Sequence, residues 1–235
     1  MNTEKQQTEG ALRESDGRST VPAAVIKRLP RYFRYLRELI RMDKTRVSSA
    51  ELSEMMNVTA SQIRQDLNCF GGFGQQGYGY NVQYLYAKIC EILGVNHGFR
   101  AAVVGAGNLG KALVRSPMFE RRGVSVVALF DIDREVVGTT VGDAPVLPME
   151  QLEEQLDELA VDLVILTLPK TCADEVASRL VDTGIRGVWN FTGKELDLRH
   201  SGIVVENVHM GDSLMTLCYE VARGDLLTDD KREDT

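Results

Sequence analysis

Apolar residues recur at two different periods along the chain, and the period changes near residue 98. Before that point the spacing is helical. A helix is predicted over 31–42 and a shorter one ends near Ile26, because Pro30 is expected to break the chain between them. After it, short apolar runs alternate with helical patterns, which is typical of a parallel sheet with right-handed helical crossovers.

Two capping boxes predict a pair of short helices between residues 48 and 70. In Ser48 with Glu51, and in Thr59 with Gln62, an N-cap hydroxyl precedes a Glu or Gln by three residues, so that orphan backbone amides are satisfied reciprocally. The pair is typical of a helix-turn-helix, whose second helix lies in the major groove with its first turns at base edges. A helical hairpin without a DNA role is the alternative.

A glycine-rich segment follows the second of these helices. Residues 71–80 hold five glycines and three aromatic residues, which favours a β-hairpin over a helix. In this position a hairpin is a wing that lies along the DNA backbone or minor groove, with Tyr78 as a candidate contact. Asn81 is then expected to cap a helix that ends at Gly94 and links residues 21–80 to the rest of the chain.

The strand expected at 100–104 ends in a glycine turn, Gly105-Ala106-Gly107-Asn108-Leu109-Gly110, and a helix pattern follows at once. In this context G-x-G-x-x-G predicts a pyrophosphate site, since the glycines allow a tight turn, a close backbone approach and close packing of helix on strand. Asp131 ends the next apolar strand about 24 residues after Gly107. A carboxylate there suits an adenosine ribose and repels a 2′-phosphate, which favours NAD(H) over NADP(H). In the alternative, Asp131 only caps a turn.

The rest of the sheet is predicted from four later apolar segments, at 144–147, 161–169, 187–191 and 203–208. The first is expected at an edge, and the expected strand order is 3-2-1-4-5-6, with the ligand crossing between strands 1 and 4. Residues at later strand ends are expected to line the half of the site away from adenosine: Thr167, Leu168, Pro169, Asn190 and Phe191.

The chain ends in one more amphipathic pattern. Asp212 is expected to cap a helix that runs to about Arg223, with a charged tail over 225–235. No strand follows this helix, so its apolar face packs either on a second subunit or on its own sheet.

Composition and charge separate two parts of the 235-residue chain. Residues 21–70 carry nine Lys/Arg and five Asp/Glu, a balance of +4, whereas residues 81–235 carry 15 and 25, a balance of −10. A basic module on an acidic body is typical of a DNA-binding head on a ligand-binding domain. The side chains expected to contact DNA are Arg31, Arg34, Ser48, Ser49, Thr59, Ala60, Ser61, Gln62, Arg64, Gln65 and Tyr78.

Other classes of protein are disfavoured. No apolar run approaches the roughly 18 residues of a membrane span, and residues 1–20, an expected disordered tail, lack the apolar region of a signal peptide, so a cytoplasmic protein is expected. Four scattered cysteines predict neither a disulfide nor a metal site. A dehydrogenase needs a proton donor near the hydride. The histidines, His97, His200 and His209, lie away from the expected site, so no catalytic residue is assigned.

Five motifs, in this order, closely resemble the redox-sensing transcriptional repressor family Rex over about residues 21–191. The motifs are Val21-Pro-x-x-Val-Ile-x-Arg-Leu-Pro30-x-Tyr-x-Arg-Tyr-Leu36, Val47-Ser-Ser-x-Glu-Leu52, Val58-Thr-Ala-x-Gln-Ile-Arg64-x-Asp-Leu67, Phe70-Gly-x-Phe-Gly-x-x-Gly77-x-Gly-Tyr-Asn-Val82 and Val104-Gly-Ala-Gly-Asn-Leu-Gly110-x-Ala-Leu113.

The resemblance implies a homodimer with winged-helix heads, whose helix-turn-helix region spans 31–70, and with Rossmann cores over 98–208 after a linking helix at 81–97. It implies that a C-terminal helix at 209–224 swaps onto the partner subunit, and that the dimer binds palindromic operator DNA and leaves it when NADH occupies the core. The glycine turn would then hold the pyrophosphate of NADH or NAD⁺, and Asp131 the adenosine ribose.

The chain departs from the family pattern at three places. In the wing, Gln75 and Gln76 stand where a basic residue is usual, which predicts weaker phosphate binding. After the fourth strand Asp174 stands in place of glutamine, and after the fifth strand 192–194 reads Thr-Gly-Lys in place of Ala-Pro. Both lie near the expected nicotinamide, where Asp174 favours NAD⁺. Two other functions stay open: an NAD-dependent dehydrogenase, and a Rossmann protein that senses CoA or an adenine nucleotide.

Overall fold

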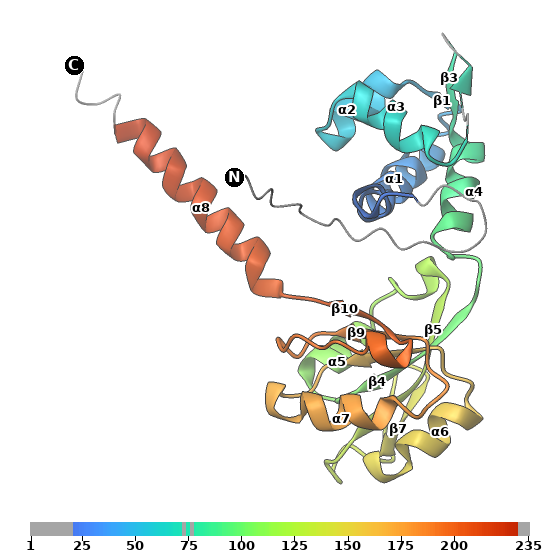
Figure 1. The fold of residues 1–235 in the computed structure, drawn as a ribbon, viewed down its shortest axis with the longest axis vertical. Helices are drawn as coiled ribbons and strands as arrows, with labels where there is room; N and C mark the ends of the chain where they lie inside the picture. Colours follow the sequence, from blue (N-terminus) through green and yellow to red (C-terminus); the bar gives the residue numbers. More distant parts are fainter. Residues whose placement is uncertain (1–20, 72–73, 76–77, 230–235) are drawn as a thin grey trace, which may run out of the picture. The chain divides into compact units, whose positions relative to one another are not determined.

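The computed structural model describes residues 21–71, 74–75 and 78–229, and the chain divides into two compact units, Met1–Asn96 and His97–Thr235 (Figure 1). The predictions for the tail over 1–20, for residues from 230 onward and for Gln76 in the wing lie outside the described residues.

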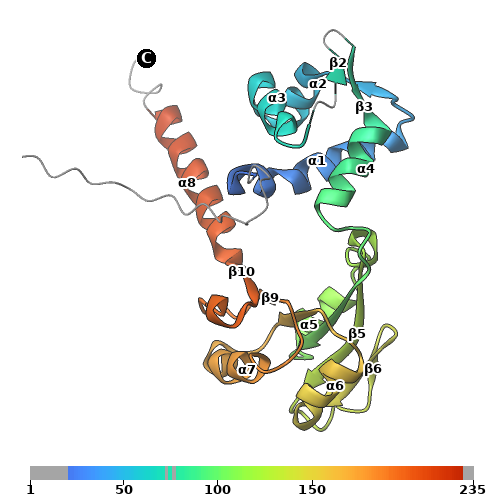
Figure 2. The same cartoon turned by 45° about the vertical axis from the view of Figure 1, so that its right-hand side comes forward.

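In its described residues the first unit combines helices with a small antiparallel sheet (Figure 2). The helices are α1 (Ala23–Arg41), α2 (Ser49–Met56), α3 (Ala60–Asn68) and α4 (Val82–Ile92). The strands are β1 (Arg46–Val47), β2 (Gly74–Gln75) and β3 (Gly79–Asn81), in the order β1-β3-β2. The predicted helix-turn-helix is α2 with α3, and the predicted hairpin is β2 with β3. The added strand β1 was not predicted.

Both capping boxes begin helices where predicted. The Ser48 hydroxyl accepts from the amide of Glu51 at 3.1 Å, and the Ser48 amide donates to the Glu51 carboxylate at 2.7 Å. The Thr59 hydroxyl likewise accepts from the amide of Gln62 at 3.1 Å. The side chain of Gln62, however, donates to Asp66 one turn later, so the second box forms only in part.

One prediction about α1 is wrong, because the helix continues through Pro30. Pro30 lies on the exposed side of the helix, where water compensates for the hydrogen bond that proline cannot donate. Leu29 and Phe33 are buried on the other side and continue one apolar face across the proline. Tertiary packing therefore outweighs the local penalty of about 3 kcal/mol.

Helix α4 packs in the core of the first unit. Its residues Leu85 and Ile89 are buried in one cluster with Leu36 of α1, and Phe33 stacks on Tyr86 with ring centroids 5.3 Å apart. The helix expected to link the two parts of the chain is thus an integral element of the first part, and the division between units follows Asn96.

The second unit contains a mostly parallel sheet. Its strands are β4 (Phe99–Val104), β5 (Val124–Asp131), β6 (Thr140–Val141), β7 (Ala144–Pro148), β8 (Leu163–Leu166), β9 (Gly187–Asn190) and β10 (Val204–Asn207). The strand order β10-β9-β8-β4-β5-β7-β6 confirms the predicted 3-2-1-4-5-6, with one addition. Strand β7 is not at the edge, because Gly142, at φ +61°, allows a tight turn through which β6 pairs antiparallel with it.

Helices cover the two faces of this sheet unevenly. On one face α6 (Leu152–Glu158) and α7 (Ala173–Leu180) pack over buried residues that include Val104 and Phe130. On the other face α5 (Asn108–Val114) follows the glycine turn. Strands β9 and β10 are joined by a loop with one 3₁₀ turn, η4 (Arg199–Ser201), in place of a helix, and Val204 is 72% exposed.

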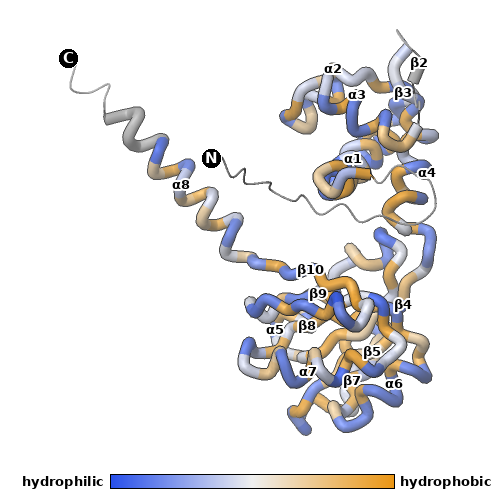
Figure 3. Tube along the Cα trace, viewed as in Figure 1, coloured by the Kyte–Doolittle hydropathy of each residue, from blue (hydrophilic) through white to orange (hydrophobic). Residues whose placement is uncertain are grey.

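The last helix, α8 (Met210–Asp229), begins before Asp212 and continues past the predicted end at Arg223. Asp212 lies in its first turn, where a negative charge suits the helix dipole. All side chains over 210–223 are exposed, and apolar and polar positions alternate along the helix (Figure 3). Within the described part of the chain, no helix is both long and apolar enough to cross a membrane.

Candidate functional site

One face of α3 is polar and open to solvent. Ser61, Arg64, Gln65 and Asn68 are exposed, at the helical spacing that places residues on a single face. Ala60 and Gln62, also predicted to contact DNA, are half-buried at its side. Asn68 was missed by the sequence-based prediction because it lies beyond the first turns of the helix. The four exposed side chains can enter one groove together.

A buried carboxylate fixes α3 to α1. Asp66 is fully buried, and its two oxygens accept from the Arg28 guanidinium at 2.7 Å each, from the Gln62 amide at 2.8 Å and from the Tyr32 hydroxyl at 3.0 Å. Burial opposes ionisation of Asp66, but these donors together hold the pKa of its carboxyl below the ordinary value. This network positions the exposed face of α3.

The two arginines predicted on α1 have different environments. Arg31 is half-buried, and its guanidinium donates to the main-chain carbonyl of Met56, so it stabilises the C-terminus of α2. Sequence did not reveal this structural role. Arg34 is exposed, with its guanidinium carbon 5.2 Å from the centroid of the Tyr35 ring.

The predicted hydroxyl contacts lie at the starts of α2 and α3. Ser48 and Thr59 accept from backbone amides as N-caps, and each hydroxyl still has a hydrogen to donate. Ser49 accepts from Arg64 at 3.1 Å, which ties the exposed guanidinium of α3 to α2.

The hairpin exposes an aromatic ring beside a cation. Tyr78 is 68% exposed, its carbonyl accepts from Arg46 at 3.1 Å, and the Arg46 guanidinium lies 5.7 Å from the centre of its ring. Gly79, at φ +68°, is required here, because a Cβ would lie 2.7 Å from the carbonyl oxygen of Val47. Arg46 was not predicted, since only the β1–β3 pairing brings it to the hairpin.

The glycine turn of the second unit requires glycine at two positions. Gly105 has φ +102°, and a Cβ there would lie 2.9 Å from the carbonyl of Thr167. At Gly110 a Cβ would collide with the carbonyl oxygen of Gly105. Gly107 is the N-cap of α5 and is exposed with Asn108. The turn is therefore tight on its inner side and open to a ligand at its tip.

Asp131 fastens this turn. One carboxylate oxygen accepts from the amide of Ala106 at 2.6 Å, and the other accepts from the amide of Asp133 at 2.9 Å. The end of β5 and the glycine turn are thus held together before any ligand is considered. Each oxygen retains a further lone pair for a ribose hydroxyl.

The ends of β8 and β9 approach the same edge of the sheet. The Thr167 hydroxyl donates to the carbonyl of Gly105 at 2.7 Å, while Leu168 is half-buried and Pro169 is exposed. Asn190 is only 1% exposed, and both its amide hydrogens and its oxygen bond to protein atoms. The side chain of Asn190 thus shapes the loop from within, and its predicted place beside the ligand stays a prediction. Phe191 packs edge-on against Trp189.

The two departures from the family pattern at this edge pair with each other. The ammonium of Lys194 forms an ion pair with the carboxylate of Asp174, at the start of α7. The charge of Asp174 is thus balanced within the protein, which sequence spacing did not predict.

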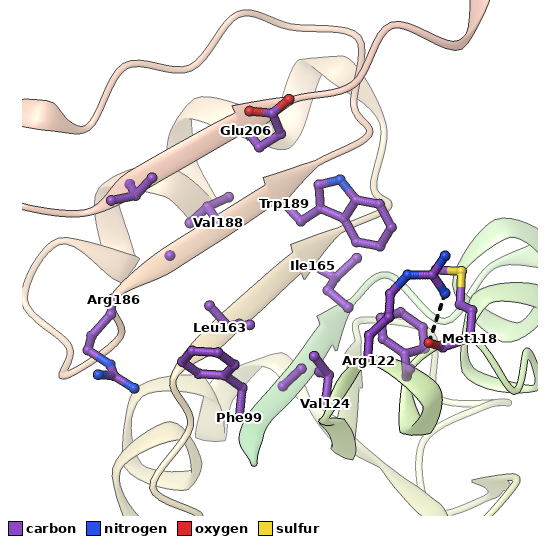
Figure 4. Close-up of a pocket in the computed structure, with 14 residues that line it drawn as sticks. Phe99, Met118, Arg122, Val124, Leu163, Ile165, Arg186, Val188, Trp189 and Glu206 are labelled. Carbon is purple, nitrogen blue, oxygen red and sulfur yellow. Dashed lines mark hydrogen bonds between the residues drawn. The ribbon is translucent and has the colours of Figure 1, made fainter. Parts of the chain in front are cut away.

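An apolar hollow of about 740 Å³ lies on the sheet face that also carries α5, at the side where the described chain has no α-helix between β9 and β10 (Figure 4). Its lining includes Phe99, Phe119, Leu163, Trp189 and Val204. Arg122, whose guanidinium donates to the Met118 carbonyl at 3.0 Å, lines it as well. Sequence periodicity did not predict this feature, because it arises from the missing crossover helix between β9 and β10.

Comparisons with known proteins match both units of the chain. Residues 20–68 match the family model described as "Putative DNA-binding protein N-terminus", and residues 96–193 match the CoA binding domain. The redox-sensing transcriptional repressor Rex of Caldicellulosiruptor bescii is 47% identical over 87% of this chain and 94% of its own.

Two solved structures are similar over nearly the whole chain. The crystal structure of RSP in complex with β-NAD⁺ and operator DNA has a TM-score of 0.82 at 45% identity and covers 92% of this chain and 100% of that one. RSP in complex with β-NADH has the same TM-score at 43% identity and covers 90% and 99%. With its winged helix, its nucleotide-binding sheet and these relatives, the chain belongs to the redox-sensing transcriptional repressor Rex family.

Proposed function

We propose that this protein is a DNA-binding transcriptional repressor that responds to the NADH/NAD⁺ ratio. The observation that carries the proposal is the presence, in one chain, of an exposed polar recognition face on α3 and of a glycine turn closed by Asp131. Full-length relatives that are named Rex repressors support it. The protein acts in the cytoplasm, because operator DNA and NAD(H) meet there.

On DNA, α3 lies in the major groove and reads bases through Arg64 and Gln65, which suit guanine and adenine respectively. Ser61, and Asn68 as an addition, lie on the same face. Ser48, Ser49, Thr59 and Arg34 bind phosphates, and Tyr78 with Arg46 follows the backbone at the hairpin.

The dinucleotide binds across the carboxyl edge of the sheet. The pyrophosphate meets the backbone of 105–110, the adenosine ribose meets Asp131, and the nicotinamide lies beside Thr167, Leu168, Pro169 and Phe191. An apolar surrounding disfavours the cationic ring of NAD⁺ through desolvation, and a tenfold preference for NADH requires only about 1.4 kcal/mol. NADH is the ligand that releases the operator.

Two copies form a homodimer by exchanging α8. In α8, Leu214, Leu217 and Val221 share one face and are exposed, and the hollow beside Val204 is an apolar surface of matching kind. Burial of both removes apolar area from water. The dimer presents two α3 helices to half-sites one helical turn, about 34 Å, apart, and NADH changes that separation.

Two measurements test this proposal. Selection from random-sequence DNA by the full-length protein is expected to enrich an inverted repeat, and enrichment of an asymmetric site would contradict the dimeric arrangement. Sedimentation is expected to give a dimer for the parent and for Glu220→Gln, but a monomer for Leu217→Glu. A dimeric Leu217→Glu protein would refute the exchange of α8.

Two rivals are tested by ligand panels. The match of residues 96–193 to the CoA binding domain favours CoA as a second candidate, although the 3′-phosphate of CoA suits Asp131 poorly. Calorimetry with NADH, NAD⁺ and CoA separates these ligands. A dehydrogenase would oxidise NADH with a panel of carbonyl substrates, and we expect no turnover.

A further inference from the structure

We propose that Asn207 and Glu195 are positioning residues that couple the dinucleotide edge of the sheet to α8. This inference rests on the proposed function, because it concerns how an occupied site is sensed. It is carried by a continuous series of hydrogen bonds that starts at the carboxyl end of β9 and ends at the first turn of α8.

The series begins at Asn190, the last residue of β9. Its side-chain oxygen accepts from the amide and the hydroxyl of Thr192, at 3.0 and 2.7 Å. Its side-chain nitrogen donates to the carbonyl of Lys194 at 2.6 Å and to the side-chain oxygen of Asn207 at 2.7 Å. One buried amide therefore fixes the loop of residues 191–194, where the nicotinamide is proposed to lie, to the end of β10.

Every hydrogen-bonding position of the Asn207 side chain is occupied by the end of β9 or by the connection that follows it. Its oxygen accepts from Asn190 and from the amide of Leu196, the second at 3.2 Å. Its nitrogen donates to the carboxylate of Glu195 at 2.8 Å and to the carbonyl of Leu196 at 3.1 Å. An amide side chain offers two donors and two acceptor positions, so none is left over.

Glu195 carries the series to α8. Its second carboxylate oxygen lies 2.6 Å from the Nε2 atom of His209, the residue before the first residue of α8. The carbonyl of His209 accepts from the amide of Asp212 in the first turn, at 3.1 Å. The base of α8 is thus held to the same loop that borders the dinucleotide edge.

This arrangement makes α8 respond to the loop. All donors and acceptors of the Asn190 and Asn207 side chains are already used. When the loop of residues 191–194 moves, it therefore either breaks these hydrogen bonds or moves the end of β10 and His209 with it. A ligand that binds preferentially to one loop arrangement therefore selects one direction of α8, and with it one arrangement of a dimer that exchanges α8.

The test measures coupling separately from binding. Using a selected operator, the dissociation constant of DNA is measured without NADH and at saturating NADH, and the ratio of the two constants is the coupling factor. For Glu195→Ala we expect that factor to fall at least about fivefold, with the dissociation constant of NADH nearly unchanged. Glu195→Gln can still bond to both Asn207 and His209, so it is expected to restore most of the coupling.

A matched control and a second variant keep the test decisive. Asp197→Ala removes an ion pair with Arg199 in the same connection, and we expect it to keep the coupling factor of the parent. If Glu195→Ala does not fold, His209→Ala, which cuts only the last bond, is expected to lower the factor instead. A parent protein whose DNA binding ignores NADH would refute the proposed function. A parent that responds, with folded Glu195→Ala and His209→Ala proteins that respond equally, would refute this inference alone.

Discussion

The guanidinium of Arg28 on α1 holds both carboxylate oxygens of Asp66 on α3, with each nitrogen–oxygen distance at 2.7 Å. Asp66 is fully buried, whereas the side chain of Arg28 is 25% exposed. The recognition helix is therefore fixed to α1 by an ion pair with two-point geometry, in addition to apolar packing. Such a pair specifies orientation, and the loss of one partner leaves a buried charge unpaired.

Replacement of Asp66 by alanine is expected to lower the free energy of unfolding of the first unit by about 3 kcal/mol, the lower end for a buried pair, because Arg28 retains some water. Operator affinity falls with it, since α3 loses its orientation. Denaturant unfolding of the full chain measures the first effect, with exposed Glu54→Gln as the control. Equal stability of the Asp66→Ala and Glu54→Gln proteins would show that the pair does not hold α3.

The first unit is also expected to lose stability in acid. The ion pair with Lys44 and the bonds from Ser48 lower the pKa of Glu51 to about 2, and the pKa of Asp66 is lowered as well. Folding lowers the pKa of both carboxyl groups. The two carboxylates therefore stabilise the fold fully above the ordinary carboxyl pKa of about 4, and this stabilisation is lost as the pH falls through their pKa values in the folded protein.

Thermal unfolding between pH 7 and pH 2 measures this loss. The melting temperature of the parent is expected to decline below about pH 4, and Glu51→Gln, which removes one of the two groups, is expected to decline less steeply. Parallel curves for the two proteins would exclude Glu51 as a source of the acid sensitivity.

The exposed face of α3 is expected to determine the DNA sequence specificity of the protein. Arg64→Ala is expected to weaken operator binding by about 1–3 kcal/mol and to relax the preference at one base position, since a base contact carries sequence information. Arg34→Ala is expected instead to weaken binding to all sequences alike and to lower the salt slope by about one. Binding to a set of single-base operator variants at several salt concentrations distinguishes them. An identical profile for the two variants would place Arg64 on the phosphates.

The ion pair of Lys194 with Asp174 is expected to affect the preference of the protein for NAD⁺ or NADH. Lys194→Gln leaves the carboxylate unbalanced and is expected to raise affinity for NAD⁺ relative to NADH, whereas Asp174→Asn is expected to do the opposite. A unit charge about 4 Å away and screened as in bulk water is worth about 1 kcal/mol, or roughly a fivefold change in the ratio. The double variant, which removes both charges, serves as the control and returns near the parent. If the ratio is the same in all four proteins, the pair lies outside the reach of the nicotinamide.

Features that depend on local residue spacing or on general rules of chain connection could be predicted from the sequence. The capping hydroxyls of Ser48 and Thr59, the glycines at 105 and 110, and the strand order follow from local spacing and from rules of chain connection. The break expected at Pro30 failed because packing on both sides of the proline outweighs a local penalty.

Features that join distant residues could not be predicted. Arg28 and Asp66 are 38 residues apart, Arg31 and Met56 are 25 apart, and spacing gives no signal for either contact. Asn190 was placed at the correct strand end, but its side chain turns inward because Asn207, on a neighbouring strand, offers a partner. The Lys194 pair with Asp174 likewise depends on how the loop after β9 meets the first turn of α7.

The proposed repressor both binds operator DNA and releases it in response to NADH. The most direct measurement is a titration of the operator complex with NADH and NAD⁺ in the same assay, with CoA as a third ligand. NADH is expected to dissociate the complex at concentrations at least about tenfold below those of NAD⁺, a difference of about 1.4 kcal/mol, while CoA leaves the complex intact. Dissociation of the complex by NADH and by NAD⁺ at the same concentration would contradict this function, as would DNA binding that persists at saturating NADH.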